Sequence, residues 1–74
     1  MSFSDEQIER WASELFAFLS NNDGQSYASR IISELSIPDN DALDMALMKM
    51  HQNGISVFRG SRPNMRKGEI VWIK

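Results

Sequence analysis

The chain of 74 residues is long enough for one small domain, residues 1–74, and its lack of cysteine excludes disulfides and thiolate metal sites. Hydrophobic residues make up 42% of it, and it shows neither a basic and apolar leader nor an apolar run of about 20 residues, so we expect a folded, cytoplasmic protein without a membrane partner. The net charge of −2 conceals a division, because residues 1–53 carry nine acidic and three basic side chains and residues 55–74 carry one acidic and five basic ones.

The first predicted helix begins after Ser4, whose hydroxyl can accept a hydrogen bond from the backbone amide of Gln7. Phe3 and Ile8 stand where a hydrophobic staple belongs. Apolar residues then recur at helical spacing, at Ile8, Trp11, Ala12, Leu15, Phe18 and Leu19. Residues 21–24, Asn-Asn-Asp-Gly, break this pattern and end the helix.

Two further helices are expected before residue 54. Ser26 can cap a second helix of about ten residues, which must stop before Pro38 because proline disfavours helical geometry in the residue ahead of it. Three residues after Pro38 are candidate N-caps of the third helix: Asp39, Asn40 and Asp41. Its inner face is predicted to be Leu43, Ala46, Leu47 and Met50. Gly54 ends it in a left-handed conformation, with Ile55 placed to contact Met50.

The remainder of the chain has the composition of strands. Residues 55–59 and 69–73 are rich in β-branched and aromatic side chains, and residues 60–68 join them with Ser, Arg, Pro, Asn and Lys. This pattern predicts a two-stranded β-hairpin with a long basic tip. The predicted fold class is therefore α+β, with three helices followed by a hairpin.

This order of elements resembles a winged helix-turn-helix domain over most of the chain. Local support comes from residues 46–55, Ala-Leu-Met-Lys-Met-His-Gln-Asn-Gly-Ile, which look like the end of a recognition helix leading through a glycine into the first wing strand. The resemblance implies binding of double-stranded DNA by a transcriptional regulator, in which the exposed start of the third helix enters the major groove and the hairpin contacts the phosphate backbone or the minor groove.

The first hypothesis is therefore DNA binding through a basic wing. The candidate phosphate contacts are Arg59, Arg62, Arg66 and Lys67, with Asn40, Met45 and Lys49 nearest the groove. The alternative is that the four cations of the hairpin are simply solvated and discourage aggregation between strand edges. The acidic start of the third helix opposes base reading, since Asp39, Asp41 and Asp44 repel phosphate.

The second hypothesis is a protein-interaction module, a regulatory or adaptor subunit. Met45 and Met48 fall outside the inner face of the third helix and can form an adaptable apolar strip beside Asp41 and Asp44. The alternative is that they pack under the hairpin or against the first helix. Trp72 shares one strand face with Ile70, and Val71 and Ile73 share the other, so the outer face can meet a protein partner or a second copy in a homodimer, or be buried.

Enzyme activity is not expected. His51 is the only histidine, and it stands at the end of the third helix, so neither a Ser, His and Asp set nor a zinc site can be assembled with confidence. The group of Asp39, Asp41 and Asp44 lacks the glycine and glutamate of a calcium loop, and no glycine-rich phosphate loop is present. We therefore predict no catalytic residue, metal or cofactor.

Overall fold

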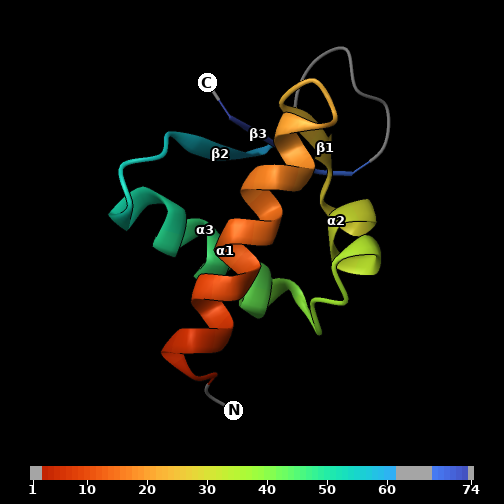
Figure 1. Ribbon diagram of the computed structural model, residues 1–74. Helices are drawn as coiled ribbons and strands as arrows, with labels where there is room; N and C mark the ends of the chain where they lie inside the picture. Colours follow the sequence, from red (N-terminus) through yellow and green to blue (C-terminus); the bar gives the residue numbers. More distant parts are fainter. Residues whose placement is uncertain (1–2, 62–67, 74) are drawn as a thin grey trace.

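The computed structural model describes residues 3–61 and 68–73, and it has an α+β architecture (Figure 1). The elements are α1 (Asp5–Ser20), β1 (Gln25–Tyr27), α2 (Ala28–Glu34), α3 (Asn40–Gln52), β2 (Val57–Gly60) and β3 (Ile70–Ile73). In Figure 1, α1 runs upward across α3 and the sheet, and α2 lies to the right. The strands form one antiparallel sheet in the order β1-β3-β2, so the last strand of the chain is central, and the layout is compatible with a winged helix.

Helix α1 begins as its capping pattern predicts. The Ser4 hydroxyl accepts from the Gln7 backbone N–H at 3.2 Å, and the buried face of the helix consists of Trp11, Ala12, Leu15 and Leu19. After Ser20 the chain reverses through Asp23 and Gly24, which both have positive φ, and the Gly24 N–H donates to the Leu19 carbonyl at 2.7 Å. Glycine meets this conformation without the steric cost of a Cβ.

The prediction of a two-stranded sheet is wrong, because residues 25–27 form a third strand. Ser26 lies in β1 opposite Val71 of β3, with its side chain buried, and it does not cap α2. Helix α2 instead begins after Tyr27, without a side-chain cap, and spans seven residues, which is shorter than predicted. Backbone hydrogen bonds explain the change: the Ala28 N–H donates to the Glu69 carbonyl at 2.9 Å, so strand pairing satisfies the group that a cap would have served.

Helix α3 agrees closely with its sequence pattern. Of the three candidate caps, Asp39 is the one used, since its Oδ1 accepts from the Ala42 N–H at 2.8 Å. At the other end the Ile55 N–H donates to the Met50 carbonyl at 2.9 Å and the Gly54 N–H to the His51 carbonyl at 3.0 Å, which is a Schellman motif. The predicted inner face of Leu43, Ala46, Leu47 and Met50 is buried.

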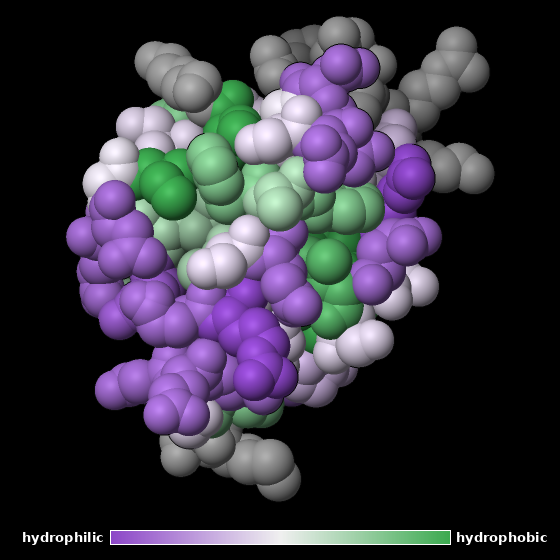
Figure 2. Space-filling model, viewed as in Figure 1, coloured by the Kyte–Doolittle hydropathy of each residue, from purple (hydrophilic) through white to green (hydrophobic). Residues whose placement is uncertain are grey.

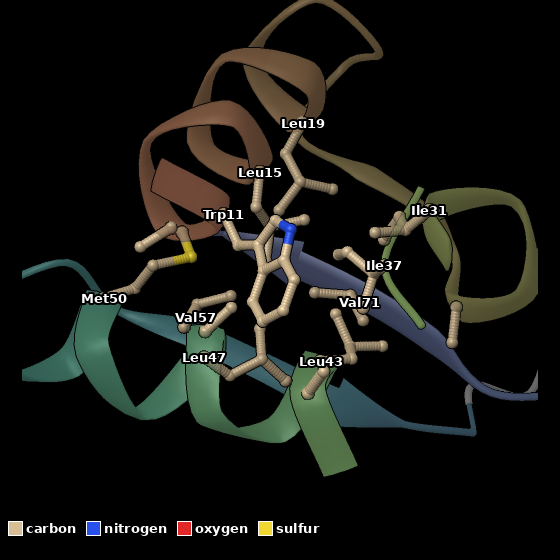
Figure 3. Close-up of a cluster of buried hydrophobic side chains, with 14 residues drawn as sticks. Trp11, Leu15, Leu19, Ile31, Ile37, Leu43, Leu47, Met50, Val57 and Val71 are labelled. Atoms are coloured by element: carbon tan, nitrogen blue, oxygen red, sulfur yellow. The ribbon is translucent and has the colours of Figure 1, made fainter. Parts of the chain in front are cut away.

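The hydrophobic core is centred on Trp11, which is 6% exposed. Figure 3 shows its indole ring reaching from α1 toward Leu43 and Leu47 of α3, with Val71 of β3 beside it. Ile31 of α2 and other buried residues complete one continuous cluster. A small domain has little apolar surface to spare, so each of these side chains carries a substantial share of the stability.

We expect the substitution Leu15→Ala to lower the free energy of unfolding by about 2–5 kcal/mol, because Leu15 is fully buried and its removal leaves a cavity. The neighbouring Phe16 is 43% exposed, so Phe16→Ala is the matched control and should cost less than about 1 kcal/mol. Urea denaturation followed by tryptophan fluorescence measures both. Equal losses for the two variants would contradict the assigned orientation of α1.

Candidate functional site

Two adjoining hollows between the N-terminal end of α1 and the outward face of α3 share Met45 and Met48. The first has a volume of about 490 Å³ and is lined by Phe3, Pro38, Asp39, Asp41, Asp44, Met45 and Met48. The second, of about 170 Å³, is lined by Asp5, Ile8, Met45, Met48, Lys49 and Gln52. We call these two hollows together the acidic methionine groove.

The groove depends on the spacing of residues on α3. Asp41, Asp44, Met45 and Met48 occur at intervals of three and four positions, which places them on one face of a helix. Met45 is half-buried, whereas Met48 is 62% exposed. Neither methionine is therefore fully buried, and Met48 is the more exposed of the two.

The opposite wall of the groove comes from the start of the chain. Phe3 precedes α1, and its ring meets Trp11 edge to face, with the ring centroids 5.1 Å apart. This contact holds Phe3 at the rim of the core, where it lines the same hollow as Met45. The sequence indicated Phe3 as part of a hydrophobic staple, but its place in a groove with α3 becomes visible only when the two helices pack together.

Arg59 of β2 is held by three side chains from other segments. Its Nη1 donates to Asp44 Oδ1 at 2.7 Å, and its Nη2 donates to Asn40 Oδ1 at 2.6 Å and to Glu69 Oε1 at 3.0 Å. The register of the sheet places Arg59 opposite Val71, so both side chains point toward the helices. The Arg59 side chain is 16% exposed, and its charge is balanced by two carboxylates within the molecule.

The carboxylates along the groove differ in what they already bind. Asp44 accepts from Arg59, and Asp39 accepts from the backbone at the start of α3. Asp41 is exposed and pairs with no cation among residues 3–61 and 68–73. This end of the groove therefore keeps a negative potential that a cationic group can use.

Three of the six residues predicted to bind DNA lie in the described part of the chain: Asn40, Lys49 and Arg59. Asn40 and Arg59 bond to each other, and Lys49 lies in the groove with its Nζ 3.8 Å from Glu9 Oε1. Arg62, Arg66 and Lys67, the other three candidates, lie outside the described residues. Of the predicted DNA contacts, the described part of the chain thus brings Asn40 and Arg59 together.

Trp72, the remaining interaction candidate, lies on the sheet face that points away from the core. The register aligns Gln25, Trp72 and Phe58 across the three strands. The rings of Phe58 and Trp72 stack with centroids 5.7 Å apart, and His51 meets the Phe58 ring edge to face at 6.5 Å. Sequence reasoning missed Phe58 and His51 here because the contact depends on cross-strand register, which an isolated strand pattern does not reveal.

Large exposed apolar side chains occur on three elements, and the described ones are Phe16 of α1, Met48 of α3 and Phe58 of β2. On the face seen in Figure 2, hydrophilic residues predominate in the lower half and hydrophobic ones gather in the upper half and to the right of the centre. Of the three side chains, Met48 is the one that lines the groove. Phe16 therefore offers a matched position where an apolar side chain is exposed outside the groove.

Comparison of the chain with protein-family models, curated proteins and solved structures yields no match. Across the described ranges, no helix combines the length and apolar character needed to span a membrane. The same residues contain no cluster of three or more His, Cys, Asp or Glu side chains suited to a metal ion. The geometry of the surfaces is therefore what bears on function.

A double-mutant cycle between Arg59→Ala and Asp44→Ala should give a coupling energy of about 0.5–1 kcal/mol in favour of the native pair, because the guanidinium is largely buried and the contact is short. The pair of Lys49 and Glu9, separated by 3.8 Å, serves as the comparison and should give less than about 0.3 kcal/mol. Urea denaturation at low and high salt measures both cycles. Equal coupling in the two pairs would show that the Arg59 contact lacks the expected strength.

Proposed function

We propose that this chain is a winged-helix protein-interaction module, a regulatory or adaptor subunit that docks a partner in the acidic methionine groove. The observation that carries the proposal is that Asp41, Asp44, Met45 and Met48, four interaction residues predicted from the sequence, line this one groove. The winged-helix assignment is supported by the order of the elements and by the strand order β1-β3-β2.

The chemistry of the groove suits a protein segment. Methionine side chains are flexible and polarisable, so they adapt to apolar groups of varied shape. Met48 is 62% exposed beside Phe3 and Pro38, and burying such apolar surface against a partner is favourable by about 25 cal/mol for each Å² removed from water. A concave apolar floor with a polar rim is typical of sites that receive a helix or short peptide.

The electrostatics of α3 favour a protein partner over DNA at this surface. Asp39, Asp41 and Asp44 stand in the first part of the helix, where a winged-helix domain would approach the phosphates of the major groove. Arg59, the nearest cation from the sheet, is already balanced by Asp44 and Glu69. The free energy needed to release Arg59 would offset part of any phosphate contact it made.

DNA binding through the wing is the second candidate function, and a feature of the sequence favours it. Arg62, Arg66 and Lys67 place three cations within six positions of a chain whose first 53 residues are strongly acidic. Such a segment can contact phosphates without α3 entering the major groove. A transcriptional regulator of this kind would need a dimer or a partner, because so few phosphate contacts give weak binding.

Affinity capture tests the docking proposal: the tagged chain serves as bait for proteins in an extract of the source cells. Recovery of a bound protein by the wild type should fall about tenfold with Met48→Ser, equivalent to about 1.4 kcal/mol, because the exposed apolar contact is lost. Phe16→Ser removes an exposed apolar side chain outside the groove and should leave recovery unchanged. The proposal fails if both variants recover the same proteins in the same amounts as the wild type.

Fluorescence anisotropy with random duplex DNA at two salt concentrations tests the second candidate. If the function is docking of a protein, we expect no salt-dependent binding of duplex DNA near physiological salt. The double variant Arg62→Ala/Arg66→Ala should then give the same anisotropy as the wild type. Binding that weakens with salt and loses this dependence in the double variant would instead support the basic wing as a DNA contact.

A further inference from the structure

We infer that the occupant of the acidic methionine groove is a cationic amphipathic segment of another protein, oriented with its lysine or arginine side chains at the Asp41 end. This inference rests on the proposed docking function and adds the chemistry and direction of the bound segment. It follows from the unequal distribution of charge and apolar surface along α3.

The groove has two chemically different ends. Asp39, Asp41 and Asp44 lie toward the start of α3, whereas Lys49 and Gln52 lie toward its end, where Asp5 also lines the hollow and Lys49 Nζ lies 3.8 Å from Glu9 Oε1. From Asp41 to Gln52 the helix rises by roughly 16 Å, at 1.5 Å for each residue, so the groove extends along about three turns of α3. A segment bound along the groove therefore meets three carboxylates at one end and, at the other, one carboxylate together with a cation and an amide, and this difference in charge favours one direction of binding.

Among the three carboxylates at the start of α3, Asp41 is the one best placed to receive a partner's cation. It is exposed and has no cationic partner within the described ranges, whereas Asp44 already accepts from Arg59 at 2.7 Å. Asp39 uses one oxygen to cap α3 and keeps its charge. An ammonium or guanidinium at this end thus meets Asp41, which forms no ion pair within the described ranges, between two carboxylates that already hold hydrogen bonds, and it need not displace Arg59.

The middle of the groove specifies the apolar part of the occupant. Met45 and Met48 lie where the two hollows join, with Phe3 on one side and Ile8 on the other. Apolar side chains of a bound helix, three or four positions apart, would lie over this floor. The same three carboxylates repel phosphate, so the chemistry is that of a protein segment and not of nucleic acid or an anionic lipid surface.

Methyl NMR of the methionines tests the inference with a synthetic helical peptide that has leucines at helical spacing and lysines confined to its N-terminal half. The methyl signals of Met45 and Met48 should shift on titration, and that of the fully buried Met50 should not. Replacing the lysines by glutamate, or the leucines by serine, should weaken binding at least tenfold. A nitroxide at the lysine-rich end should broaden the amide signal of Asp41 more than that of Gln52.

Charge reversal separates a local contact from an effect of net charge. Asp41→Lys should weaken binding of the leucine and lysine peptide about tenfold, whereas Glu14→Lys, the same change at an exposed position of α1 outside the groove, should leave affinity within about twofold. Equal weakening by the two variants would overturn the inference, as would equally tight binding of the glutamate peptide or unchanged signals of Met45 and Met48.

Three outcomes separate this inference from the function on which it rests. If a captured protein is lost with Met48→Ser but is unaffected by Asp41→Lys, docking in the groove stands and the cationic occupant is wrong. If sedimentation shows that the chain dimerises and that Asp41→Lys abolishes the dimer, the groove receives a second copy, which also overturns the inference. If Met48→Ser changes no captured protein, the docking function itself fails.

Discussion

The pairing of β3 with two strands that are distant from each other in the sequence is the constraint on which the rest of the structure depends. Among the described residues, β3 is the last strand along the chain and the middle strand of the sheet, and it pairs with both β1 and β2. Ile70 and Val71 are fully buried there, and Val71 belongs to the core around Trp11. Without this strand and Glu69, which directly precedes it, the start of α2 would lose its backbone partner, and β2 would lose its pairing with β3.

The register of that pairing also decides the electrostatics of the surface. Because Arg59 lies opposite Val71, its side chain points toward the helices and meets Asn40, Asp44 and Glu69. A cation from the basic end of the sequence is thereby used inside the molecule to join β2 to α3. The remaining carboxylates of α3 border a groove with an apolar floor, and this combination supports docking of a protein segment more than base reading by α3.

Local patterns in the sequence predicted α1 and α3 well, but they failed where the structure depends on non-local pairing, as at the start of α2. The cap at Ser4, the inner face of α3 and the reversal at Gly54 each depend on residues within seven positions of one another. β1 was missed because its three residues, Gln-Ser-Tyr, carry no strand periodicity of their own. They become a strand through hydrogen bonds to a segment more than 40 positions later, which shortens α2 at its start and turns Ser26 from an expected cap into a buried strand residue.

The candidate site, too, was predictable only where it depends on local spacing along one helix. The sequence by itself determined that Asp41, Asp44, Met45 and Met48 share one face of α3, since helical spacing is a local property. Only the tertiary structure decided that Phe3 and Pro38 complete a groove over that face and that Arg59 is held by carboxylates. The physical reason is that the spacing of side chains on one helix follows from backbone geometry, whereas contacts between elements follow from how strand register and core packing bring distant parts of the chain together.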